Sequence, residues 1–113
     1  MNIQIFGIAK SFDTKKAERW FKERGIRFQS IDMKRYGLAG REYDSVLAAV
    51  GGVDRMIDWE AKYPEINMLR QMTDERAKED LVYDNQALIR LPVVRNGRKA
   101  TVGYCPEIWK TWE

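Results

Sequence analysis

The chain contains no histidine and a single cysteine, Cys105, in 113 residues. The absence of histidine excludes a Ser-His-Asp triad, an imidazole base and a histidine-ligated metal site. One cysteine cannot form a disulfide or a Cys-x-x-Cys pair within the chain, and it fits a reducing, cytoplasmic compartment. Long apolar runs are also missing. The apolar stretch 3–9 is too short to span a membrane, and no basic residues precede it as they would in a signal peptide.

The overall composition is typical of a folded domain. Hydrophobic residues make up 44% of the chain and charged residues 33%. Twenty Lys and Arg against 17 Asp and Glu give a formal charge of +3, and acidic residues gather on the predicted helix at 74–84. This pattern argues against nucleic acid as a partner. We find no linker, repeat or low-complexity tract, so we expect one domain over residues 1–113.

The first third of the chain predicts a strand, a helix and a second strand. Residues 3–6 are rich in β-branched and aromatic side chains, which indicates a strand. Residues 12–24 change to helical spacing with one apolar face, and either Ser11 or Asp13 can cap that helix. Residues 26–31 again suggest a strand. A strand-helix-strand unit of this kind predicts that the two strands are parallel.

The middle of the chain predicts a helical insertion, at about residues 40–84. Its apolar residues recur at helical spacing, and glycine, proline and a capping threonine mark the boundaries. We expect helices at 43–50, around Met56 and Ile57, after Pro64, and from Thr73 to Asp84 with Ala77 and Leu81 facing inward.

The last third predicts a hairpin and a final helix. Residues 91–95 and 98–102 flank Asn96-Gly97, which favours a type I′ turn. Cys105-Pro106 starts a helix whose apolar face we expect to be Ile108, Trp109 and Trp112. The order β-α-β, helices, β-β-α predicts a thioredoxin-like α/β fold with a mixed sheet of about four strands.

Two stretches resemble the arsenate reductase/Spx family. One runs from Ile5-Phe6-Gly7 through Ser11-Phe12-Asp13-Thr14 to Ala17, and the other is 84–94 followed by Val102-Gly103-Tyr104. Members of this family have a thioredoxin fold related to glutaredoxins, and the resemblance covers essentially the whole chain. It implies a cis Pro92 that exposes the backbone of residue 91 for pairing with an extended peptide or tripeptide.

The resemblance also implies that the redox site is degenerate. Family members carry a nucleophilic cysteine where this chain has Ser11, and many carry a second one where it has Thr14. A helix N-terminus lowers a thiol pKa, but a hydroxyl there is a poor nucleophile without a base. The arginine that precedes the proline in reductases is Leu91 here, with Arg90 one residue earlier and expected to face the opposite way in a strand. A further family arginine has no match around Asp58-Trp59-Glu60.

The candidate ligand-binding residues therefore surround the position of the missing thiol: Lys10, Ser11, Thr14, Lys15, Arg90, Leu91 and Pro92. Lys10, Lys15 and Lys16 would hold an anion such as a carboxylate, or else form a solvated basic face. Ser11 has the alternative role of a simple helix cap.

Cys105 and the tryptophans have competing interpretations as well. Cys105 is either a displaced thiol beside the degenerate site or a small residue at a helix start. We expect Trp20 and Trp109 to be core residues on the helices that flank the cleft. Trp59 has no apparent inward partner and is a weak interface candidate.

We consider three functions, and take the first as the hypothesis. The first is a non-catalytic thioredoxin-fold protein that binds a protein partner or a small anionic thiol ligand such as glutathione. A partner in the manner of the Spx branch would make it a transcription-associated regulator that binds RNA polymerase. The second is a monothiol glutaredoxin- or arsenate-reductase-type oxidoreductase using Cys105. The third, nucleic-acid binding, has the least support because the excess of positive charge is small.

Overall fold

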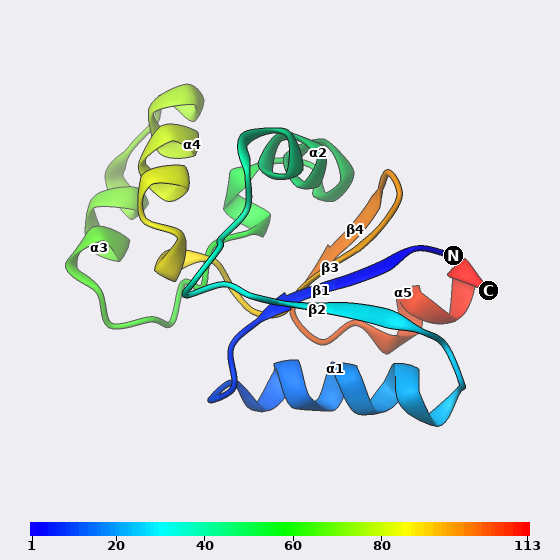
Figure 1. The fold of residues 1–113 in the computed structure, drawn as a ribbon. Coiled ribbons are helices and arrows are strands. Elements are labelled where there is room, and N and C mark those ends of the chain that lie inside the picture. Colours follow the sequence, from blue (N-terminus) through cyan, green and yellow to red (C-terminus); the bar gives the residue numbers. More distant parts are fainter.

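Four strands form one mixed sheet in the order β2-β1-β3-β4 in the computed structural model, which describes residues 1–113 (Figure 1). β1 pairs with β2 in parallel, whereas the β1–β3 and β3–β4 pairs are antiparallel. The strands are β1 (Ile3–Gly7), β2 (Phe28–Asp32), β3 (Val93–Asn96) and β4 (Lys99–Val102). The helices are α1 (Phe12–Glu23), α2 (Gly40–Val50), α3 (Pro64–Gln71), α4 (Glu75–Asp84) and α5 (Pro106–Trp109), with 3₁₀ turns η1 (Val53–Arg55), η2 (Gln86–Leu88) and η3 (Lys110–Trp112). The predicted mixed sheet, with helices inserted before the hairpin, is confirmed.

Alternating side chains on the central strands divide the core into two layers. Ile5 of β1 and Val94 of β3 pack with α1 and α5, whereas Phe6 and Val93, one residue away on each strand, pack with the helical insertion. Figure 1 shows α1 and α5 on one side of the sheet and α2, α3 and α4 on the other. The predicted core aromatics are all buried in the first layer: Trp20, Phe21, Trp109 and Trp112.

α1 begins close to the end of β1 and is capped by Ser11. The Ser11 Oγ accepts a hydrogen bond from the Thr14 N–H over 3.1 Å, which satisfies one of the free donors of the first turn. Of the two caps expected, Ser11 is therefore the one used. Asp13 instead places a negative charge in the first turn, where the helix dipole favours it.

The insertion is helical, but two of its predicted boundaries were wrong. The apolar pair Met56-Ile57 does not form a helix. It follows the 3₁₀ turn η1, and Ile57 forms a β-bridge with Ile89. A pair of apolar residues carries no periodicity, so the sequence could not distinguish a helical turn from a bridge. The cap of α4 is Asp74 rather than Thr73, because the Asp74 carboxylate accepts the hydrogen bond that closes the first turn.

The buried face of α4 also differs from the prediction by one residue. Lys78 and Val82 face inward, whereas Ala77 and Leu81 are only partly buried. The Lys78 Nζ lies 2.6 Å from a carboxylate oxygen of Asp54, so its charge is paired where the side chain is buried. A prediction from hydropathy alone places a lysine on the solvent-facing side of a helix, because the sequence does not reveal a carboxylate partner such as Asp54.

The β3–β4 hairpin is confirmed, but its turn is of a different type. Asn96 pairs with Lys99, so the two central residues are Gly97 and Arg98. Gly97 has a φ of 62°, and no residue other than glycine has a positive φ. The expected type I′ turn, which needs positive φ at both central residues, is therefore wrong, and glycine at the first central position fits type II′.

Two further details at the element ends depart from expectation. β2 begins at Phe28 rather than Ile26, because the Ile26 N–H bonds to the Phe21 carbonyl and completes the end of α1. Ile108, which was expected to face inward, is 48% exposed, while its neighbour Trp109 is fully buried. Since α5 spans one turn, it buries only part of its apolar residues.

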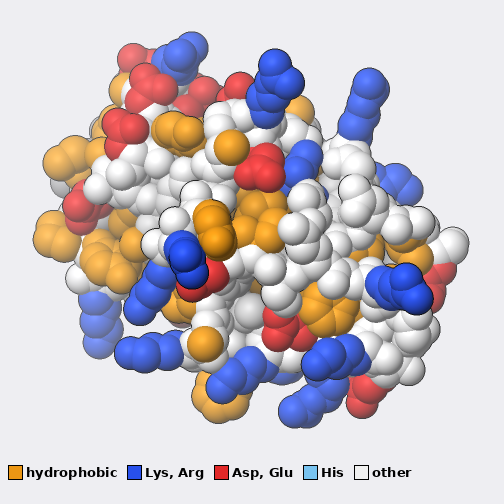
Figure 2. Space-filling model, in the orientation of Figure 1, with side chains coloured by type: hydrophobic (Ala, Val, Ile, Leu, Met, Phe, Trp, Pro, Cys, Tyr) orange, Lys and Arg blue, Asp and Glu red, His pale blue; other side chains and the backbone are white.

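Acidic and basic side chains are unevenly distributed over the face seen in Figure 2. Basic side chains gather along the edge formed by α1, and acidic ones over α4 at the opposite corner. The exposed acidic residues of α4 and its cap are Asp74, Glu75, Asp80 and Asp84, which agrees with the predicted solvated face. None of the helices is both long enough and apolar enough to span a membrane.

Candidate ligand-binding cleft

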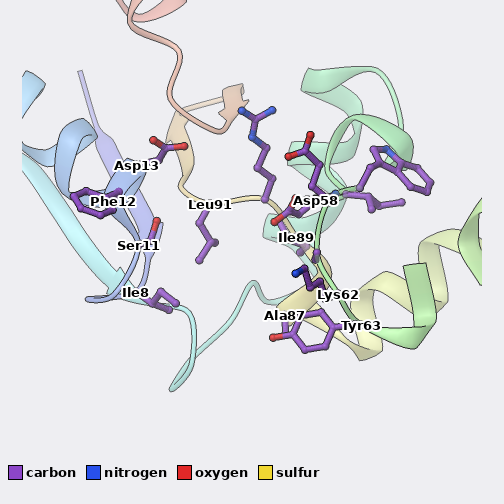
Figure 3. Close-up of a pocket in the computed structure, with 15 residues that line it drawn as sticks. Ile8, Ser11, Phe12, Asp13, Asp58, Lys62, Tyr63, Ala87, Ile89 and Leu91 are labelled. Carbon is purple, nitrogen blue, oxygen red and sulfur yellow. Dashed lines mark hydrogen bonds between the residues drawn. The ribbon is translucent and has the colours of Figure 1, made fainter. Parts of the chain in front are cut away.

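A cleft of about 990 Å³ lies between the start of α1 and the 57–63 segment of the insertion. Leu91 lies between the two walls in Figure 3, with Ser11 and Asp13 on one side and Asp58 and Tyr63 on the other. The lining residues are Ile8, Ser11, Phe12, Asp13, Ile57, Asp58, Trp59, Glu60, Ala61, Lys62, Tyr63, Ala87, Ile89, Arg90 and Leu91.

Two backbone hydrogen bonds hold the 57–63 segment beside residues 89–91. The Asp58 N–H donates to the Leu88 carbonyl and the Arg90 N–H donates to the Met56 carbonyl, each over 2.8 Å. These bonds flank the isolated bridge between Ile57 and Ile89. The insertion thus contributes a second wall opposite α1.

The backbone of Leu91 is free to pair with a ligand. The Leu91–Pro92 peptide bond is cis, as the family resemblance implied. The Pro92 carbonyl accepts a hydrogen bond from the Gly103 N–H over 2.9 Å, which ties the loop to the end of β4. Neither the N–H nor the C=O of Leu91 takes part in any backbone hydrogen bond of the chain. One donor and one acceptor therefore remain unpaired beside the cleft.

The structure brings together only part of the predicted ligand-binding set. Ser11, Arg90 and Leu91 line the cleft, and Pro92 is buried directly behind Leu91. Arg90 was expected to face the opposite way from Leu91 in a strand, but the strand that this expectation assumed is absent. Residues 90–92 do not form a regular strand, so the alternation of side chains does not apply to them.

The other predicted residues lie around the start of α1, outside the cleft. Thr14 and Lys15 line a separate groove of about 410 Å³ between α1 and the ends of β1 and β2. Lys10 is exposed and lines neither this groove nor the cleft. The Lys16 Nζ lies 4.4 Å from the centroid of the Tyr104 ring, a cation–π contact on the α5 side of the helix. The lysines therefore do not form an anion-binding cluster in the cleft.

Cys105 is the N-cap residue of α5, as predicted, but it does not line the cleft. Its thiol donates to the Val102 carbonyl over 3.4 Å. Burial raises the pKa of the Cys105 thiol above its ordinary value, against an opposing effect from the charge of Arg90. This shift is opposite to the lowered pKa that a redox-active thiol at a helix start needs.

Sequence reasoning missed most of the second wall and the side chains beside Ser11. Phe12 is 82% exposed and Tyr63 is 49% exposed, and both line the cleft. Trp59, also in the lining, donates its indole N–H to the Asp54 carbonyl over 2.9 Å. No local motif marks these residues. In the 57–63 segment the only sequence signal is the presence of large apolar side chains without helical or strand periodicity.

The sheet order, the two helical layers and the cis-proline loop define a thioredoxin-like fold. The glutaredoxin-like protein NrdH-redoxin from Escherichia coli superposes with a TM-score of 0.53 at 19% identity, covering 100% of this chain and 96% of that one. The ArsC family model matches residues 6–112. The chain therefore belongs to the ArsC family, as the resemblance implied.

Two relatives show the range of proteins that this chain is similar to. The global transcriptional regulator Spx 2 of Oceanobacillus iheyensis is 27% identical over 106 residues, which cover 92% of this chain and 78% of that protein. A putative ArsC family related protein from Bacteroides fragilis has a TM-score of 0.86 at 22% identity, covering 100% of this chain and 98% of that one. The second likeness shows the fold alone.

Proposed function

We propose that this chain is a non-catalytic ArsC/Spx-type domain, spanning residues 1–113, whose cleft binds an extended segment of a protein partner in the cytoplasm. The observation that carries the proposal is the unpaired N–H and C=O of Leu91 beside a cleft rimmed by exposed aromatic side chains. An extended peptide binds to such groups by adding main-chain hydrogen bonds, while pockets receive its side chains.

The residue at the start of α1 supports binding rather than catalysis. The Ser11 Oγ is the acceptor that caps α1, and the chain contains no imidazole to activate it. A hydroxyl cannot form the mixed disulfide that a thiol forms. The raised pKa of Cys105 and its position outside the cleft lining speak against a monothiol mechanism that uses it.

The partner to test first comes from the relative in Oceanobacillus iheyensis. That protein is a global transcriptional regulator, so we choose RNA polymerase as the first candidate. Glutathione is the small-ligand alternative, since it is itself a short extended peptide. Lys62 and Arg90 would favour its carboxylates, while Asp13, Asp58 and Glu60 would oppose them.

The experiment measures binding of the purified chain to RNA polymerase and to glutathione by calorimetry. We expect the double variant Phe12→Ala/Tyr63→Ala to weaken polymerase binding by about tenfold or more, because exposed aromatic anchors dominate interface energies. Ile108→Ala is the matched control, since Ile108 is an exposed apolar residue on α5 outside the cleft. Equal losses in both variants would contradict the cleft as the binding site.

A parallel assay tests the absence of catalysis. We expect no glutathione-dependent disulfide or arsenate reduction by the unmodified chain, and gain of thiol-disulfide exchange in Ser11→Cys, where α1 would lower the pKa of the new thiol. Reductase activity in the unmodified chain that persists in Cys105→Ser would overturn the non-catalytic proposal. Activity that disappears in Cys105→Ser would instead establish the monothiol mechanism.

A further inference from the structure

Three carboxylates line the cleft without a cationic partner. Asp13 belongs to the α1 wall, and Asp58 and Glu60 to the opposite one. None of them takes part in the ion pairs of the chain. Asp58 accepts one hydrogen bond, from the Glu60 N–H over 3.2 Å. Figure 3 shows Asp13 and Asp58 on opposite sides of Leu91.

The lining also contains two cations, Arg90 and Lys62, against its three carboxylates. A Cβ placed on Gly103 would lie 3.0 Å from the Arg90 Nε and 3.3 Å from its Cζ. The guanidinium of Arg90 is therefore held against Gly103, near Cys105, and neither of those residues lines the cleft. Lys62 is exposed and forms no ion pair. A ligand lying along Leu91 thus meets a carboxylate on either side.

The placement of the carboxylates on opposite walls favours one kind of cation over another. No three acidic, cysteine or histidine side chains of the chain come together closely enough to hold a metal ion. Carboxylates on opposite walls instead suit a long side chain whose charged end extends between them. A guanidinium offers five donors in a planar fork and can bond two carboxylates at once, while an ammonium offers three donors on a flexible stem.

Resting on the proposed function, we infer that the bound segment carries an Arg or Lys side chain that extends between Asp13 and Asp58, next to the residue that pairs with Leu91. Apolar side chains of the segment pack on Phe12 and Tyr63, whose exposed rings lie at the cleft. The cleft is therefore selective for a basic, apolar-flanked peptide and disfavours a ligand with several carboxylates.

Three pools of blocked hexapeptides test this preference. Each pool is randomised over apolar residues and has Arg, Gln or Glu at the third position. Binding is followed by the amide NMR signals of Ser11 and Leu91. We expect the Arg pool to bind best and the Glu pool worst, with the advantage of Arg decreasing as salt is added.

Removing the carboxylates gives the matched comparison. In Asp13→Asn and Asp58→Asn we expect the preference for the Arg over the Gln pool to fall by about two- to fivefold, the range of solvent-accessible ion pairs. The amide oxygen that Asp58→Asn introduces would still accept from the Glu60 N–H, so the loop is expected to keep its conformation. Asp84→Asn, which removes the same charge at the exposed end of α4, should leave the preference unchanged.

The outcomes separate this inference from the proposed function. If every pool shifts the Leu91 signal but Gln or Glu binds as well as Arg, the charge preference is refuted and peptide binding stands. If no pool shifts the signals of the cleft, both are refuted. A loss of preference in Asp84→Asn equal to that in Asp58→Asn would also refute the inference, because net charge alone would then explain it.

Discussion

The side chain of Thr14 lies directly against the backbone of Gly7, where α1 crosses the end of β1. A Cβ placed on Gly7 would come within 2.4 Å of both the Cγ2 and the Oγ1 of Thr14. Thr14 is 5% exposed, and its buried Oγ1 has no hydrogen-bond partner. The position of α1, and with it the position of Ser11 beside the cleft, therefore depends on a residue without a side chain at position 7.

We predict that Gly7→Ala destabilises the protein by about 1–3 kcal/mol, because the added methyl group overpacks this contact. Thr14→Ala removes the two atoms nearest to the added methyl group and keeps only the Thr14 Cβ, 2.9 Å from it, so the double variant should be less destabilised than the sum of the single variants. Urea denaturation of the four proteins measures this coupling. Strict additivity would show that α1 does not rest on Gly7.

The elements next to this contact were predictable from sequence because their signals are local. The β-branched and aromatic residues Ile3, Ile5 and Phe6 indicate β1, and the helical spacing of Ala17, Trp20 and Phe21 indicates α1. The thioredoxin-like fold followed from the order of the elements, and the ArsC family and the cis Pro92 followed from the resemblance; the comparisons and the structure confirm all three.

The second wall of the cleft could not be predicted in this way. It depends on the bridge between Ile57 and Ile89, which are 32 positions apart, and no periodicity connects them. The strand expected to include residues 91 and 92 is also shorter than predicted, since β3 begins only at Val93. The inward position of Lys78 likewise depends on Asp54, a partner from another element. Tertiary contacts of this kind are invisible to local patterns.

The ion pair between Lys78 and Asp54 predicts an asymmetric response to mutation. Lys78 is 7% exposed, whereas the carboxylate of Asp54 is largely exposed. Asp54→Asn leaves a buried ammonium with only Glu75, 3.9 Å away, and we expect a loss of about 1–3 kcal/mol. Lys78→Met replaces the lysine with an apolar side chain of similar length, and we expect a change below about 1 kcal/mol. Thermal unfolding at neutral pH compares the two.

The same pair predicts a loss of stability in alkali. The hydrogen bond to Asp54 raises the pKa of Lys78 above its ordinary value of 10.5. A raised lysine pKa means that the stabilisation is complete below the unfolded-state pKa and is lost as the pH rises through the folded-state pKa. The free energy of unfolding, measured by denaturation at a series of pH values above 10.5, should therefore fall less steeply with pH in Lys78→Met than in the unmodified protein. Identical pH profiles would contradict the pair's contribution.

Tyr43 predicts a second alkaline effect, of different origin. Its ring is buried, and its hydroxyl donates to the Glu79 carbonyl over 2.8 Å. Burial first, and then the nearby carboxylates of Glu79, Asp80 and Asp44, raise the pKa of Tyr43 well above its usual value of 10.0. The unfolded state therefore releases this proton at a lower pH than the folded state, so stability should fall as the pH rises above about 10.

The variant Tyr43→Phe tests separately the hydrogen bond of the Tyr43 hydroxyl and its ionisation. At neutral pH we expect a loss of about 0.5–1.5 kcal/mol for the missing hydrogen bond. In alkali the variant should lose stability less steeply than the unmodified protein, because it has no phenol to ionise. Tyr36→Phe is the control, since Tyr36 is 68% exposed and should change neither quantity. Parallel alkaline profiles of Tyr43→Phe and the unmodified protein would show that Tyr43 ionises equally in both states.

The burial of the tryptophans predicts which of them reports on the cleft in a fluorescence-quenching experiment. Trp20 and Trp109 were expected to be core residues on the helices that flank the cleft, and both are buried between the sheet and α1 and α5, with exposed fractions of 5% and 0%. Trp59 lines the cleft itself, so iodide should quench Trp59 and leave the buried tryptophans largely unaffected. We expect Trp59→Phe to remove most of the quenchable emission and Trp20→Phe to retain it. A peptide that occupies the cleft should then protect Trp59 from iodide in Trp20→Phe. If iodide quenches the same fraction of the emission in Trp59→Phe as in the unmodified protein, Trp59 is not the solvent-accessible tryptophan of the cleft.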